Sequence, residues 1–120
     1  MVEKMSKIEI IMNPDKFEDL KEAMNGIGVT GMTVTNALGC GLQKGHKEYY
    51  RGVQVEINLK QKLKVEIVVC EVPVETAIQT ALKILQTGNI GDGKIFVYDV
   101  VDAVRIRTAE RGPAAVKDPK

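Results

Sequence analysis

The sequence predicts an α+β domain in which two strand–helix–strand units form one antiparallel sheet. Three observations support this: alternating apolar and polar residues typical of strands, two segments with apolar residues at helical spacing, and glycine- or proline-containing turns between them. A chain of 120 residues has the size of one domain with its own core. With 44% hydrophobic but only 4% aromatic residues, that core is expected to be mainly aliphatic.

The first unit is predicted to begin with a short strand at residues 8–12, where apolar side chains alternate. A helix should follow, because Asn13 can cap its first turn and Pro14 suits its first position. Apolar residues at helical spacing extend that helix over residues 17–27, and glycines end it. The segment GMTVTNAL, residues 31–38, then predicts a second strand.

A long polar loop, predicted at about residues 39–57, separates the two units. It begins with GCGLQKGHKEYYRG, which contains four glycines and two tyrosines but no apolar run. Two alternating runs follow. Residues 53–59 indicate a half-buried strand or one arm of a hairpin, and residues 63–69 indicate a further strand.

The second unit contains a helix that is predicted to start near Pro73 and to stop at Gly88. The turn GNIGDG leads into a strand at residues 94–100. A last, shorter strand is expected at residues 104–107, where two apolar residues alternate with two arginines.

This order of elements predicts a ferredoxin-like βαββαβ domain over residues 1–112. Residues 113–120, which follow Gly112 and include two prolines and two lysines, are expected to be disordered. Both helices should cover the same face of a four-stranded antiparallel sheet. Because no further element is predicted to cover the other face, self-association is expected to bury it.

The charge and cysteine content exclude several classes of protein. A net charge of +1 provides no general attraction to nucleic acid or to anionic membranes. No apolar segment approaches the roughly 20 residues needed to cross a bilayer, and the N-terminus lacks an apolar signal region. Cys40 and Cys70 are expected to be reduced thiols, so a cytoplasmic location is predicted.

Two segments of the second unit have residues that could bind phosphate groups. In GNIGDGK, residues 88–94, glycine amides and the Lys94 ammonium could contact an anion, although most such segments are simple turns. Arg105 and Arg107 would project from the same face of a strand and could bind a polyphosphate. The alternative is a solvated edge strand whose arginines prevent aggregation.

The long loop and the strand after it have further candidates. The amides of Gly39, Gly41 and Gly45 could surround an anion. The side-chain oxygen of Gln43 could ligate a metal, and Lys62 could pair with a carboxylate. Each feature alone is more often an ordinary loop or surface residue, but three phosphate-binding elements in one small chain favour a shared anion site.

Several long sequence strings occur together in an order typical of one family. They are GMTVTNALGCGLQKGH, YRG, KVEIVV, TGNIGDGKIFV and VRIRT. With these strings the sequence resembles the PII nitrogen-regulatory signal-transduction proteins over residues 8–108. The resemblance implies a homotrimer of ferredoxin-like subunits, with clefts between neighbours that bind ATP or ADP competitively. It also implies that 2-oxoglutarate binds beside Mg-ATP and that the protein is a regulator rather than an enzyme.

The resemblance implies a set of ligand-binding residues from both halves of the chain. The positions expected around the nucleotide are Thr33, Gly39, Glu66, Val68, Gly91, Asp92, Gly93, Lys94, Arg105 and Arg107. The positions expected to hold 2-oxoglutarate are Gly41, Lys44, Gly45 and Lys62. Gln43 is implied as the protein ligand of Mg²⁺, whose other ligands come from ATP and 2-oxoglutarate.

The long loop resembles the T-loop of this family, whose base touches the ligands and whose tip touches target proteins. Tyr49, Tyr50 and Arg51 are therefore implied as target-binding residues. The target would be an ammonium-transport channel, in which the arginine matching Arg51 plugs the pore exit, or a nitrogen-metabolism enzyme. Contact with a membrane would be indirect, through the transporter, and no nucleic acid is expected.

The loop departs from relatives at three functional positions. Val55 stands where relatives controlled by uridylylation have the modified tyrosine, and Val53 where others have a phosphorylated serine. Direct control by metabolites is therefore expected. Leu42 stands where many relatives have an arginine beside the phosphates, which predicts weaker triphosphate binding, or an altered ATP/ADP preference, by ~1–3 kcal/mol.

Two other functions share this topology. A small phosphotransferase or weak ATPase could use His46 or Lys94, but no acid–base pair is placed by the sequence to support catalysis. An RNA-binding module would need stacking aromatic residues on its central strands, where this chain has Val, Ile and Lys. A regulator is therefore the favoured interpretation.

Overall fold

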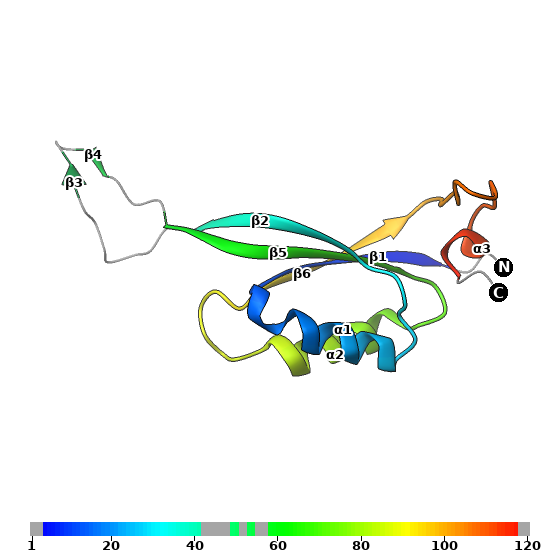
Figure 1. Ribbon diagram of the computed structural model, residues 1–120, viewed down its shortest axis with the longest axis horizontal. Helices are drawn as coiled ribbons and strands as arrows, with labels where there is room; N and C mark the ends of the chain where they lie inside the picture. The colour runs from blue at the N-terminus through cyan, green and yellow to red at the C-terminus, as the bar shows by residue number, and fades with distance from the viewer. Residues whose placement is uncertain (1–3, 42–48, 51–52, 55–57, 118–120) are drawn as a thin grey trace.

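The computed structural model describes residues 4–41, 49–50, 53–54 and 58–117. Two helices lie on one face of a four-stranded antiparallel sheet (Figure 1). The strands are β1 (Met5–Met12), β2 (Thr33–Gly41), β5 (Asn58–Val69) and β6 (Gly93–Val100), in the spatial order β2-β5-β1-β6. The helices are α1 (Phe17–Gly26) and α2 (Val74–Leu85). This topology confirms the predicted ferredoxin-like fold.

The hydrophobic core lies between the sheet and the two helices. On β1, Ile8 and Ile10 are almost completely buried, opposite Ile67 and Val65 of β5. Strand alternation brings these four side chains to the helix-covered face. The helices add Leu20, Met24, Ala77 and Ala81 to the same cluster. Burial of each large aliphatic side chain contributes roughly 1.5–3 kcal/mol, so the aliphatic core predicted from the composition stabilises this layer.

The opposite face of the sheet has a network of charged and polar side chains, and none of the described elements covers it. The Lys7 ammonium donates a hydrogen bond to Glu66 over 3.0 Å and lies 4.8 Å from the centre of the Tyr98 ring. Lys64 lies 3.7 Å from the Glu9 carboxylate, which also accepts a hydrogen bond from the Tyr98 hydroxyl. The hydrogen bond from Lys7 is the main cause that lowers the pKa of Glu66.

The start of the first helix differs from the prediction. Pro14–Lys16 form a 3₁₀ turn, η1, before α1 begins at Phe17. The Asn13 side chain makes no capping hydrogen bond, because it contacts Gly91 and Lys62 instead. The second helix follows Pro73 as predicted, but it ends at Leu85, before Gly88.

The long loop is shorter than predicted, because strand pairing continues beyond Gly39. β2 extends to Gly41 and pairs there with Asn58, the first residue of β5. Within the loop, β3 (Tyr49–Tyr50) pairs with β4 (Val53–Gln54) as a small separate hairpin (Figure 1). The alternation at residues 53–59 is therefore divided between two strands, and residues 55–57 lie outside the described part.

The strand predicted at residues 104–107 is wrong. Val104 forms only an isolated bridge with Arg111, and residues 106–108 form a turn. Ala109 has a positive φ of 62°, which reverses the chain after this turn. The segment expected to be a disordered tail begins with a single helical turn, α3 (Pro113–Val116).

Candidate functional site

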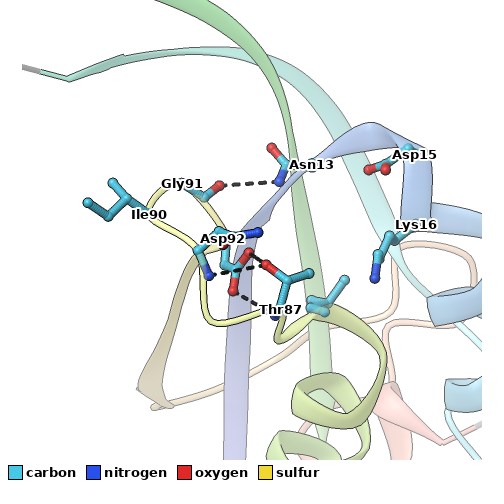
Figure 2. A pocket seen from close by; sticks show the side chains of 9 residues that line it. Asn13, Asp15, Lys16, Thr87, Ile90, Gly91 and Asp92 are labelled. Atoms are coloured by element: carbon cyan, nitrogen blue, oxygen red, sulfur yellow. Dashed lines mark hydrogen bonds between the residues drawn. The ribbon is translucent and has the colours of Figure 1, made fainter. Parts of the chain in front are cut away.

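A cluster of polar groups lies at the end of the sheet where β1 ends and β6 begins. The Lys62 ammonium donates hydrogen bonds to Asn13 Oδ1 and to the Gly91 carbonyl, each over 2.6 Å. The Asn13 amide donates to the same carbonyl over 3.2 Å (Figure 2). Only 8% of Lys62 is exposed, which is unusual for a lysine. The structure thus places the predicted ligand residue Lys62 against the predicted phosphate loop.

Gly39 leaves room for the buried lysine. A Cβ atom at this position would lie 3.2 Å from Cγ and 3.6 Å from Cε of Lys62. Gly39 itself pairs with Lys60 across the β2–β5 ladder. The absence of a side chain therefore has a packing reason, in addition to the nucleotide contact that the resemblance implies for this residue.

The loop between α2 and β6 is held together by Asp92. Its carboxylate accepts hydrogen bonds from the amides of Thr87, over 2.8 Å, and Gly88, over 3.0 Å, and from the Thr87 hydroxyl (Figure 2). These bonds, the hydroxyl bond first, lower the pKa of Asp92. The predicted phosphate ligand Asp92 therefore organises the loop, and its ionised form supports this role at neutral pH.

A pocket of about 280 Å³ opens beside this loop. Both polar and apolar residues line it, and Figure 2 shows Lys16 and Asp15 on the side of the first helix and the loop on the other side. Its nine lining residues are Asn13, Asp15, Lys16, Leu85, Thr87, Asn89, Ile90, Gly91 and Asp92.

Glycines shape the end of the loop where β6 begins. Gly91 and Gly93 have φ angles of +100° and +119°, a region that favours glycine. A Cβ atom on Gly93 would lie 1.8 Å from the Ile11 carbonyl oxygen, so no other residue can occupy this position without a backbone shift. Lys94 follows as an exposed residue, paired with Ile11 on β1.

Other predicted nucleotide residues lie on the uncovered face of the sheet. Lys62, Glu66 and Val68 alternate along β5 and therefore share that face. Thr33 on β2 lies directly opposite Glu66. The structure thus places Thr33, Glu66 and Val68 on the same face of the sheet as the buried lysine.

Arg105 and Arg107 lie elsewhere, in the segment after β6. Arg105 donates a hydrogen bond to the Glu110 carboxylate over 2.9 Å. Its second terminal nitrogen donates to the carbonyl oxygens of Lys117 and, over 3.5 Å, Ala115. Arg107 belongs to an exposed turn. The prediction that both arginines project from one strand face is therefore wrong, because the chain turns to form these local bonds.

The loop and the arginines occupy opposite ends of the sheet. β6 runs from Gly93, opposite Met12, to Val100, opposite Met5 (Figure 1). A strand of 8 residues spans about 25 Å at about 3.3 Å per residue. One subunit therefore does not bring Arg105 and Arg107 to its own Gly91–Lys94 segment.

Several predicted site residues receive little or no description in the structure. Gly41 ends β2, and Tyr49 and Tyr50 form β3. Four further predicted site residues lie outside the described part: Gln43, Lys44, Gly45 and Arg51. The same is true of Leu42 and His46. Among the described residues, no group of three or more His, Cys, Asp or Glu side chains could hold a metal ion.

Sequence reasoning missed the role of Asn13. An asparagine before a proline and a helical segment is a typical capping pattern, and nothing in this local pattern indicates a long-range contact. Asn13 contacts residues 49 and 78 positions away along the chain. Only the packing of the loop on the end of β1 shows these contacts of Asn13.

Comparisons with known proteins place the chain among regulators. The model of the nitrogen regulatory protein P-II family matches residues 5–110. A nitrogen regulatory PII-like protein of Bacillus subtilis is 52% identical over 112 residues, covering 93% of this chain and 97% of that protein. The B. subtilis GlnK–ATP complex has a TM-score of 0.82 and 46% identity, covering 96% of this chain and 98% of that chain. Citrate-bound PII of Arabidopsis thaliana has a TM-score of 0.75 and 38% identity, covering 93% and 92% of the two chains.

The fold and the loop-end cluster define a ferredoxin-like domain with a group of polar residues at one end of its sheet. The family match and the relatives then identify the chain as a member of the nitrogen regulatory protein P-II family. The predicted family is thus confirmed. Because its relatives are regulatory proteins, the alternative of a phosphotransferase is not retained. No helix among the described residues is both long and apolar enough to cross a membrane.

Proposed function

We propose that this protein reports nitrogen, carbon and energy status to a target protein. As a homotrimer it binds ATP or ADP in clefts between neighbouring subunits, and it binds 2-oxoglutarate beside Mg-ATP. The occupied clefts then select a conformation of the T-loop. Membership of the P-II family supports the regulatory role, and the ATP complex of the GlnK relative supports nucleotide binding.

The separation of the two cationic groups is the observation that carries the proposal. The Gly91–Lys94 segment and Arg105 lie at opposite ends of one sheet, about 25 Å apart along β6. A triphosphate is much shorter than this distance. A site that uses both groups therefore needs a loop from one subunit and arginines from the next, which a ring of identical subunits provides.

The exposed surface of β6 also supports self-association. This edge strand has three consecutive large side chains, Phe96, Val97 and Tyr98, that are 43%, 47% and 44% exposed. Large apolar groups gathered on an edge strand favour burial against another copy. Neighbouring subunits would cover this strand and the polar face beside it.

The groups at the loop end are suited to anionic ligands. The amides of Gly91–Gly93 and the Lys94 ammonium would hold phosphate oxygens, and Lys62 would bind a carboxylate of 2-oxoglutarate. Gln43 would contribute one ligand to Mg²⁺, with ATP and 2-oxoglutarate supplying the others. Thr33, Gly39, Glu66 and Val68 would surround the nucleoside on the uncovered face.

Ligand binding would reach the target through the two strands that lead into the T-loop. β2 and β5 pair as far as Gly41 and Asn58, so Lys62 and Gly39 lie close to the loop base. A ligand can favour one loop conformation only by its differential affinity for that conformation. Tyr49, Tyr50 and Arg51 would then contact a cytoplasmic target, such as an ammonium-transport channel or a nitrogen-assimilation enzyme.

Titration calorimetry tests this proposal. ATP and ADP should bind with competition, and 2-oxoglutarate should bind only when both ATP and Mg²⁺ are present. Native mass spectrometry of the same sample should show a trimer. Binding of 2-oxoglutarate without nucleotide would contradict the shared metal ion, and a monomer that binds neither nucleotide would overturn the proposal.

A further inference from the structure

We propose that Asn13 is a positioning residue for the Lys62 ammonium. In this role it holds the ammonium against the Gly91 carbonyl and thereby couples the carboxylate-binding position to the phosphate loop. The inference rests on the proposed function, in which Lys62 binds 2-oxoglutarate. It adds the residue that directly follows β1 to a site that otherwise consists of β5 and the loop before β6.

The hydrogen bonds of Lys62 leave its charge available. Both of its acceptors, Asn13 Oδ1 and the Gly91 carbonyl, are neutral oxygens. None of the ion pairs between described residues includes Lys62. An ammonium has three N–H donors, and the described residues accept hydrogen bonds from two of them. The third can be donated to a carboxylate of a ligand without loss of either protein contact.

Burial makes the orientation of this ammonium important. At 8% exposure the Lys62 side chain has little contact with solvent, and the neighbouring Gly39 backbone confines its stem. A buried cation without hydrogen bonds would be strongly destabilising. Asn13 and Gly91 together satisfy it while keeping a net positive charge. This combination pre-organises an anion site, which lowers the entropic cost of binding.

Asn13 also connects the lysine with the loop. Its amide donates to the Gly91 carbonyl that accepts from Lys62, so the three residues form a closed triangle of hydrogen bonds. At the other side of the same loop, Asp92 binds the amides of Thr87 and Gly88. Gly91 itself is exposed, and the triangle is what fixes this part of the loop to the sheet.

Three variants test the inference. Asn13→Ala removes both hydrogen bonds, whereas Asn13→Asp keeps the acceptor but adds a negative charge beside Lys62. Asn25→Ala is the matched control, because Asn25 is an exposed asparagine in the last turn of α1. Two quantities are measured for each trimer: the rate at which acetic anhydride modifies Lys62, relative to Lys64 by peptide mass spectrometry, and the affinity for 2-oxoglutarate in Mg-ATP.

The two substitutions at Asn13 should change the acetylation rate of Lys62 in opposite directions. Asn13→Ala should raise the acetylation rate of Lys62 at least threefold and weaken 2-oxoglutarate about fivefold, because the ammonium is no longer held. Asn13→Asp should lower the acetylation rate at least threefold, since the added carboxylate pairs with the ammonium and holds it more firmly in place. It should also weaken 2-oxoglutarate more than tenfold, by repulsion of its carboxylate.

The outcomes separate this inference from the proposed function. Equal acetylation rates in the wild type and both Asn13 variants, or a change in the same direction for both, would overturn the role of Asn13. If the wild type bound no 2-oxoglutarate, the proposed function would fail, whereas the acetylation rates would still decide whether Asn13 positions Lys62. The Asn25→Ala trimer should match the wild type in both measurements.

Discussion

The two ends of the sheet each hold a cation that the family resemblance assigns to a ligand, but they hold it differently. At the loop end, Lys62 is bound by two neutral oxygens. At the tail end, Arg105 is bound by the Glu110 carboxylate as well as by backbone carbonyls, and 16% of its side chain is exposed. Neutral acceptors position a cation, whereas a carboxylate also neutralises it.

This difference predicts unequal readiness for anionic ligands. A carboxylate that reaches Lys62 meets no competing negative charge among its described contacts. A phosphate that reaches Arg105 must compete with Glu110, which lies on the same short turn. The loop end is therefore expected to be the pre-organised half of the cleft, and the tail end the half that must rearrange.

The largest effect is expected from Lys62→Ala. This substitution removes the ammonium that forms the triangle of hydrogen bonds with Asn13 and Gly91. The affinity for 2-oxoglutarate in Mg-ATP should therefore fall roughly 100-fold, which is near the upper end of the ~1.5–3 kcal/mol typical of charged hydrogen bonds. ADP affinity should change less than about threefold, because ADP lacks the carboxylate partner. Calorimetry measures both, with the neighbouring exposed Lys60→Ala as control. Equal losses for the two ligands would instead assign Lys62 to the nucleotide.

A smaller effect of the opposite sign is expected at the tail end. Glu110→Gln removes the charge that competes for Arg105, so ATP should bind about five times more tightly. The control is Glu18→Gln, since Glu18 pairs with Lys21 on the exposed surface of α1. An unchanged ATP affinity in a trimeric Glu110→Gln protein would show that Glu110 does not compete with the phosphate for Arg105.

The local periodicity of the sequence was sufficient for most of the fold. Strong two-residue alternation at residues 63–69 and helical spacing at residues 17–27 predict elements that the structure confirms. The alternation at residues 104–107 is too short to outweigh local chemistry. There Glu110 and the Lys117 carbonyl satisfy Arg105, and a turn forms instead of a strand.

The site was predictable only where a motif identifies it. Lys62 and the GNIGDGK segment are implied by the family resemblance, and the structure brings them together. Asn13 belongs to the same cluster through contacts across 49 residues, which no local pattern encodes. The separation of Arg105 from the loop likewise follows from the direction of β6 in the sheet, and this topology had to be seen before a shared cleft could be argued.

The pH dependence provides the finest test of the tail-end contact. The hydrogen bond from Thr108, followed by the positive charge of Arg105, lowers the pKa of Glu110 below its ordinary value of 4.5. A lowered pKa means that the ionised carboxylate stabilises the folded contact above pH 4.5, and that this contribution is lost as the pH falls through the lowered value. Glu110 therefore stays ionised throughout the neutral range.

The ratio of ATP affinities between Glu110→Gln and the wild type should consequently be constant from about pH 6 to pH 8, because groups that titrate in both proteins cancel in the ratio. Calorimetry at several pH values within this range measures it. A ratio that drifts with pH would mean that the substitution acts through another titrating group and not through the Glu110–Arg105 contact. At the loop end the same invariance is expected for the ratio of 2-oxoglutarate affinities between Asn13→Ala and the wild type, since an amide does not titrate.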